Sequence, residues 1–399
     1  MPFPVIAPTL APLRPGALMR GVLAAALPSA GTDHLTASLE AMFGGVTLVL
    51  YESGRAALAE AFRVSMRATG RRRVVLPAYT SYSVAAAAAS AGVEPVLCDV
   101  DPATLALDPA ALRACVDERT AVVLLGNLFG WPEPTADLAW LDALGAVVID
   151  DAAQALGARE RGRLVGGRGR LGVLSFGRGK CVTLGEGGAL LVHDPALRAH
   201  TSAPAASGRG VRALAMALAV SLSRSRLLLG GLSRLPGVRL GESHFEPDFE
   251  ARSPAACVRA MASGLPVAVE RARAVRHQVA SRWREGLSAC AAPLRLPPPA
   301  PGSDPAFLRY PVLAPSPAAR ERYVAALAEA GFGYVRSFPL PLRGIPAFAR
   351  LLVAPTDVPG AETLASGVIA LPCHVGIGPR DISRAARALQ PLGEASGAA

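Results

Sequence analysis

The chain has 399 residues, 51% of them hydrophobic, and a formal net charge of +10 that comes from 41 basic and 31 acidic residues. This length is sufficient for two domains and a large core. The six cysteines show no CxxC pair and no metal-ligand spacing, which argues against a metal site. The basic residues are dispersed rather than gathered on a motif, so they suit anionic small molecules and indicate no nucleic acid partner.

The N-terminal segment and the longest charge-free stretch carry no targeting or membrane-spanning signal. Prolines interrupt residues 2–15, and no basic region precedes an apolar stretch there. Residues 74–93 are uncharged, but Pro77 and a polar segment interrupt them, whereas a spanning helix needs about 20 mainly apolar residues. We therefore expect a cytoplasmic enzyme with reduced thiols.

The first segment with chemical meaning is Ser53-Gly54-Arg55. It follows the apolar run Val46–Leu50 and opens a predicted helix, Ala56–Met66. A helix N-terminus presents unpaired N–H groups to an anion, and glycine allows close approach. The segment therefore predicts either a phosphate site or a simple N-cap.

Residues 73–192 alternate short apolar runs with helical stretches. One helix start is Asp108-Pro109, an N-cap followed by proline at the first helical position. The runs that we interpret as buried strands are Val74–Pro77, Pro95–Cys98, Ala121–Leu125, Ala146–Ile149, Val173–Phe176 and Ala189–Val192. This alternation predicts an α/β fold with a mostly parallel sheet, which binds ligands at the carboxyl ends of its strands.

Three ionisable residues lie at or just after such strand ends. Asp150 and Asp151 close one strand, and Lys180 follows another in a glycine-lined turn. An unhindered lysine there is well placed to form an imine, although a solvated loop lysine has the same pattern. Asp151 suits a protonated ring nitrogen or a helix cap, and Asp150 suits a structural partner.

Residues 201–250 differ in character from the rest of the chain. The apolar run Ala213–Ser223 lies between arginines that extend to Arg239, and an acidic stretch follows. One interpretation is a helical excursion packed on a dimer. The other is an amphipathic surface, residues 209–239, for peripheral contact with a membrane or a lipid-linked substrate.

The C-terminal part predicts a second domain. A helical stretch, Pro254–Leu287, leads into a proline-rich linker, Pro297–Pro305. Phe307–Leu313, a helix at Ala318–Ala330, Gly333–Arg336 and a last helix at Pro379–Leu389 then suggest a small α+β unit. We expect a large domain at residues 1–290 and a small domain at residues 291–399.

The spacing of three motifs resembles one family. Asp-Asp-Ala-Ala-Gln (150–154), Ser-Phe-x-x-x-Lys (175–180) and Gly-Glu-Gly-Gly (185–188) are similar to the DegT/DnrJ/StrS group of fold type I pyridoxal-phosphate (PLP) enzymes, mostly sugar aminotransferases. The resemblance implies that Lys180 holds PLP as a Schiff base and that Asp151 contacts the pyridine nitrogen. It further implies that Gln154 lies by the phenolic side of the ring and that Gly54 and Ser175, with Ser53, bind phosphate.

The chain departs from the family pattern at three places. Arg55 stands where the family usually has threonine, and Ser81 and then Tyr82 stand where it stacks an aromatic on the cofactor. Glu250 and Arg252 stand where an Asn-x-Arg pair reaches the phosphate of a neighbouring subunit. An ionised carboxylate donates no hydrogen bond, so we expect Arg55 to supply the lost phosphate contact.

The resemblance implies a homodimeric aminotransferase that moves an amino group from L-glutamate to a keto acceptor. The expected acceptor is a keto sugar, nucleotide-linked, in polysaccharide or secondary-metabolite biosynthesis. Two alternatives remain: a lipid-linked or other apolar carbonyl acceptor, and a non-catalytic regulator with a PLP fold.

Overall fold

The computed structural model describes residues 5–11, 13–27, 32–208, 210–223, 225–232, 244–290, 292–333, 335–354 and 356–394. Its centre is a seven-stranded sheet with the order β1-β9-β8-β5-β4-β2-β3. The strands are β1 (Thr47–Tyr51), β2 (Arg73–Pro77), β3 (Glu94–Cys98), β4 (Thr120–Leu125), β5 (Val147–Asp151), β8 (Leu171–Ser175) and β9 (Gly188–Val192). Every strand predicted between residues 73 and 192 is therefore present, and the predicted α/β class is confirmed.

The sheet is parallel except at one strand. β8, β5, β4, β2 and β3 pair in parallel, whereas β9 runs antiparallel to both β8 and β1. The residues of β4, β5, β8 and β9 are all buried, as expected for strands covered on both faces. The carboxyl ends of β5 and β8 consequently lie side by side, with Asp151 and Ser175 as their last residues.

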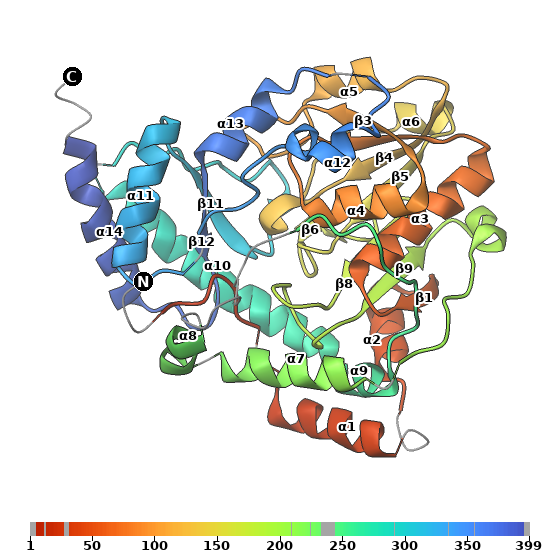
Figure 1. Ribbon diagram of the computed structural model, residues 1–399, viewed down its shortest axis with the longest axis horizontal. Helices are drawn as coiled ribbons and strands as arrows, with labels where there is room; N and C mark the ends of the chain where they lie inside the picture. The colour runs from red at the N-terminus through yellow and green to blue at the C-terminus, as the bar shows by residue number, and fades with distance from the viewer. Residues whose placement is uncertain are drawn as a thin grey trace.

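Helices cover the sheet (Figure 1). One of them begins where Asp108-Pro109 predicts a helix start. The side chain of Asp108 accepts a hydrogen bond from the Ala111 amide at 2.8 Å and caps α5 (Pro109–Cys115). The other helices of the N-terminal part are α1 (Pro15–Ala26), α2 (His34–Phe43), α3 (Gly54–Thr69), α4 (Tyr82–Ala91), α6 (Trp140–Ala143), α7 (Val211–Leu222) and α8 (Arg226–Leu232).

The predicted helix Pro254–Leu287 is two helices, α9 (Ala256–Met261) and α10 (Leu265–Ser288). Gly264 separates them because its φ of +72° is a left-handed conformation. The expected linker is also not wholly irregular. Its residues Ser303–Asp304 form β10, which pairs with β6 (Arg159–Glu160), and β6 pairs with β7 (Arg163–Leu164).

A small sheet forms the C-terminal part, at the left of Figure 1. β11 (Arg309–Leu313) pairs antiparallel with β12 (Val368–Pro372), and no strand forms at the described residues of 333–336. The accompanying helices are α11 (Pro317–Glu329), α12 (Pro346–Ala349), α13 (Pro359–Gly367) and α14 (Pro379–Glu394). None of the helices in the described ranges is long and apolar enough to cross a membrane.

A buried ionic network fixes the strand ends of the large sheet. The guanidinium of Arg168 contacts the Asp150 carboxylate at 2.6 Å, and neither side chain has exposed surface. The same guanidinium donates to the Asn127 side chain at 2.6 Å and to the Glu133 carbonyl at 2.7 Å. Asn127 follows β4 and donates to Asp150 at 2.9 Å, so the network joins the ends of β4 and β5.

Replacing Arg168 with methionine should therefore destabilise the fold strongly. The substitution leaves the Asp150 carboxylate buried without its cation, which costs about 3–5 kcal/mol. Urea unfolding of the cofactor-free protein measures the effect. Arg119→Met is the matched control, since it breaks the exposed ion pair with Asp117, which is worth about 0.2–1 kcal/mol. Equal losses in the two variants would contradict the proposed role of the network.

Candidate active site

A cavity of about 580 Å³ lies at the carboxyl ends of β5 and β8. It collects most of the site residues predicted from the sequence. Those that line it are Ser53, Gly54, Arg55, Asp151, Gln154, Ser175 and Lys180. Residues more than a hundred positions apart in the chain are thus brought into one site by the order of the strands.

The N-terminus of α3 forms one wall of this cavity. Ser53 caps the helix, and its hydroxyl accepts from the Ala56 amide at 3.2 Å. A Cβ on Gly54 would lie 2.5 Å from the Ser175 Cβ, so only glycine allows α3 to approach β8 this closely. The first turn contains no acidic residue. The helix N-terminus and the Ser175 side chain therefore form a suitable cradle for an anion.

Asp151 and Lys180 are the ionisable pair of the site. Asp151 is buried, and one of its oxygens accepts from the Ala153 amide at 2.8 Å. Burial raises the pKa of Asp151 to about 6, although that hydrogen bond and the Lys180 charge oppose the rise. Burial also lowers the pKa of Lys180, and the Asp151 charge opposes that change. A lowered pKa increases the fraction of neutral, nucleophilic amine.

Lys180 is the only lysine in the chain, since the other basic residues among the 41 are arginines. An arginine can provide charge and hydrogen bonds at any surface position, but its guanidinium stays protonated in proteins. The only side chain of this protein with a primary amine therefore lines the cavity together with Asp151. This placement is hard to reconcile with an ordinary solvated loop lysine.

Gln154 links the cavity to the loop after β4. Its side-chain oxygen accepts from the Phe129 amide at 3.1 Å. Phe129 has a φ of +59° and Asn127 a φ of +43°, conformations that are unusual for residues other than glycine. Strain of this kind tends to gather at functional sites. Phe129 itself lines the cavity.

Three predicted residues have other contacts. Tyr82 is absent from the described lining of the cavity; its hydroxyl donates to the Leu340 carbonyl at 3.2 Å. Arg252 is also absent from that lining and pairs with Glu250. Arg55 lines the cavity, but its guanidinium donates to the Glu246 carbonyl at 2.9 Å and to the Glu246 carboxylate at 3.3 Å. The cofactor roles of these three residues stay predictions.

The sequence pattern did not reveal several residues that line the cavity. An apolar wall comes from α7 and α8, and aromatic, hydroxyl and charged groups come from distant loops and from the start of β11. These residues are Met216, Val220, Leu229, Phe338, Ser337, His244, Glu246 and Arg309. No local signal identifies them, because their proximity to Lys180 depends on the tertiary fold. Asn127 was detectable, since it is a polar residue directly after a buried strand.

The predicted membrane surface at residues 209–239 is only partly described. Arg209, Arg224, Arg234 and Arg239 lie outside the described residues. Arg226 pairs with Asp381 at 2.7 Å and is engaged within the fold. Apolar side chains on α7 and α8 are exposed, among them Val211, Leu218, Leu222, Leu227 and Leu228. Membrane contact stays a prediction.

Comparisons with known proteins identify the family of the chain. A model of the DegT/DnrJ/EryC1/StrS aminotransferase family matches residues 31–220 and 257–390. Over 143 residues the chain is 39% identical to the L-glutamine:2-deoxy-scyllo-inosose aminotransferase of Micromonospora echinospora, a match that covers 34% of this chain and 33% of that protein. The chain therefore spans about a third of the length of this curated relative.

Two longer matches cover most of the chain. It is 27% identical over 322 residues to the pleiotropic regulatory protein of Geobacillus stearothermophilus, covering 78% of this chain and 77% of that protein. An aminotransferase from Streptococcus pneumoniae, solved in its PLP form, superposes with a TM-score of 0.72 at 19% identity, over 98% of this chain and 99% of that chain. This likeness shows the fold.

The raised pKa of Asp151 predicts a pH dependence of stability in the cofactor-free protein. Folding raises this pKa from 3.8 to about 6, so the folded state binds the proton more tightly than the unfolded state. The resulting stability is present below pH ~4 and is lost as the pH rises through ~6. Relative to Asp151→Asn, the wild type should therefore lose roughly 2–3 kcal/mol of unfolding free energy over that window.

Urea unfolding of both proteins at several pH values measures this difference. Asp117→Asn is the control with the opposite sign. Burial raises the pKa of Asp117, but hydrogen bonds from Arg119 outweigh this and lower it. The stability that Asp117 contributes is therefore lost as the pH falls. If the difference in unfolding free energy between the wild type and Asp151→Asn does not change between pH 4 and 7, folding does not raise the pKa of Asp151.

Proposed function

The chain belongs to the DegT/DnrJ/EryC1/StrS family of PLP-dependent aminotransferases, and on this premise we propose that it aminates a keto group on a sugar or cyclitol ring. One observation carries the proposal. A single cavity holds the amine of Lys180, the carboxylate of Asp151 and the N-terminus of α3. These are the three groups that a phosphorylated pyridine aldehyde requires.

The residues of the cavity fit PLP. Lys180 would bind its aldehyde carbon, and Asp151 would hold its ring nitrogen. The first turn of α3 at Gly54, together with Ser175, would hold its phosphate, and Gln154 would lie by its phenolic oxygen. When bound, PLP supplies an electron sink for the α-carbon of the amino donor.

The protein residues supply the ionic and proton-transfer parts of the reaction. The Asp151 carboxylate, whose pKa burial raises, gains an ionic partner in a protonated ring nitrogen and keeps that nitrogen protonated. The Lys180 amine, whose pKa burial lowers, can accept a proton from the α-carbon of the donor and deliver it elsewhere as a general base and acid. Phe129 and Phe338 line the cavity and help to exclude water.

We propose L-glutamine as the amino donor, with L-glutamate as the alternative. The family resemblance favoured L-glutamate, but the inosose relative is named for L-glutamine. For the acceptor we propose a keto sugar whose nucleotide diphosphate meets the cations of the cavity. Exposed Arg178 lines the cavity and pairs with no described carboxylate, which supports an anionic acceptor. We also propose a homodimer and a cytoplasmic location.

A second candidate function is regulation without catalysis. It is favoured by the long match to a protein named as a pleiotropic regulator. The presence of both Lys180 and Asp151 in one cavity favours the enzyme. Turnover distinguishes the two, because a regulator needs none.

Borohydride reduction of the PLP-loaded protein should fix the cofactor covalently on Lys180, since no other side chain of this protein carries a primary amine. Peptide mass spectrometry locates the adduct. Lys180→Arg keeps the positive charge but has no primary amine, so it should carry no adduct and lack the absorption band of a PLP imine. An adduct on the α-amino group of the chain in the wild type would overturn the role of Lys180.

Labelled L-glutamine or L-glutamate should transfer nitrogen to a keto sugar nucleotide. Asp151→Asn should retain the cofactor but reduce turnover by about 10²-fold or more, because general acid–base and electrostatic effects each contribute factors of this size. A panel of keto sugar nucleotides, free inososes and apolar ketones identifies the acceptor class. Preference for a free inosose would discard the nucleotide. Wild-type turnover in Asp151→Asn would discard the role of the carboxylate.

A further inference from the structure

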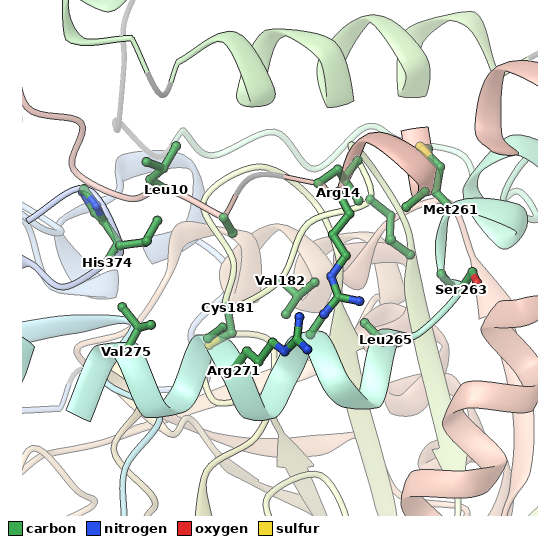
Figure 2. A pocket seen from close by; sticks show the side chains of 18 of the residues that line it. Leu10, Arg14, Cys181, Val182, Met261, Ser263, Leu265, Arg271, Val275 and His374 are labelled. Atoms are coloured by element: carbon green, nitrogen blue, oxygen red, sulfur yellow. The ribbon is translucent and has the colours of Figure 1, made fainter. Parts of the chain in front are cut away.

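A second cavity, of about 210 Å³, lies between α1, α10 and the segment that follows Lys180 (Figure 2). Among the described residues it shares only Ala11 with the cavity that contains Lys180. Nothing in the proposed reaction uses it. It is therefore a separate candidate site.

The lining of this cavity is mostly apolar. Its walls come from the N-terminal segment, the Lys180 loop, the end of α9 and the first half of α10. The apolar side chains include Leu10, Leu13, Val182, Leu184, Met261, Leu265 and Val275. Such a surface is suitable for an aliphatic chain, because its methylenes leave water when they pack against apolar side chains.

Three arginines interrupt this apolar lining: Arg14, Arg271 and Arg276. Figure 2 shows the side chains of Arg14, the residue before α1, and Arg271 on α10 directed into the same space. None of the three forms an ion pair with any carboxylate in the part of the chain that the structure describes. By contrast, Arg273, also on α10, pairs with both Glu270 and Asp304.

Arg276 is the strongest indication of a ligand. It is 4% exposed, and its Nη2 donates to the Cys181 carbonyl at 2.6 Å. Its Nε has no hydrogen-bond partner among the residues that the structure describes. A buried guanidinium without a counter-ion is costly, and the two further cations at the cavity repel it. An anion placed among them would relieve both penalties.

His374 completes the lining and supplies no charge. Its Nε2 lies 2.8 Å from the Ala7 carbonyl, and its Nδ1 accepts from the Gly376 amide at 3.0 Å. Burial lowers the pKa of His374 to about 4, so the imidazole is neutral near pH 7. The positive charge at this cavity therefore comes from the arginines alone.

We propose that this cavity binds an amphiphilic anion, with a carboxylate or phosphate head between the arginines and an aliphatic chain along the apolar wall. The proposal is independent of the aminotransferase function, because it concerns a different cavity and is tested by binding alone. Two sources share this chemistry, fatty carboxylates and lipid phosphates. Octanoate and octyl phosphate represent them.

Isothermal titration of the PLP-loaded full chain should show saturable binding of octanoate or octyl phosphate at one site per chain, and the tighter of the two names the source. Acetate has the head without the chain and octanol has the chain without the charge. Both should bind at least tenfold more weakly. Equal affinity for octanol would overturn the role of the arginines, and absence of saturable binding would overturn the site.

Variants locate the binding. The double variant Arg14→Gln with Arg271→Gln should weaken binding at least tenfold without disturbing the fold, because both side chains are exposed. Ala268→Leu fills the lining from α10 and should block the aliphatic chain. Arg273→Gln, on the same helix but outside the cavity lining, is the matched control and should leave affinity unchanged. Wild-type affinity in both the double variant and Ala268→Leu would place the ligand elsewhere and reject the proposal.

Discussion

The side chain of Arg168 is buried with no exposed surface, and its guanidinium contacts the Asp150 carboxylate at 2.6 Å. The carboxylate also accepts from the Gly166 amide at 2.7 Å and from Asn127 at 2.9 Å, so its charge is fully solvated by protein groups. This pair holds together the end of β5, the loop after β4 and the segment before β8. The cavity depends on it, because Asp151 ends β5, Gln154 follows that strand and accepts from the loop after β4, and Ser175 ends β8.

The two adjacent carboxylates show how one strand provides both structure and chemistry. Successive side chains of a strand point to opposite faces, so Asp150 turns toward Arg168 and Asp151 toward the cavity. Asp150 has a complete set of partners. Asp151 is buried, and burial raises its pKa although the hydrogen bond from the Ala153 amide opposes the rise. The strand therefore presents a carboxylate that lacks a full ionic partner to whatever ring nitrogen enters the cavity.

Much of this architecture followed from local patterns. Apolar runs bounded by polar strand ends predicted the strands, and Asp150-Asp151, Ser53-Gly54 and Lys180 were detectable because their chemistry is concentrated in short segments. Other features depend on tertiary contacts and left no local signal. Gly264 divides a helix that periodicity alone joins, and the partners of Arg55 and Tyr82 lie 191 and 258 positions away. Glu246 and Leu229 reach the cavity from a segment whose composition suggests either a packed helical excursion or an amphipathic surface.

That segment separates what is common to the family from what is particular to this chain. The family model leaves residues 221–256 unmatched, yet Ser223, Leu229, His244 and Glu246 line the cavity with Lys180. The groups suited to hold PLP lie within the matched ranges, on the sheet and on α3. These four residues of the unmatched segment are described and contact the same cavity, and Glu246 also accepts from Arg55 in the first turn of α3. In many proteins a rigid scaffold positions the reactive groups, and variable connecting segments shape the binding pocket. Acceptor selectivity should accordingly be sought first at Ser223, Leu229, His244 and Glu246, which the family model does not match.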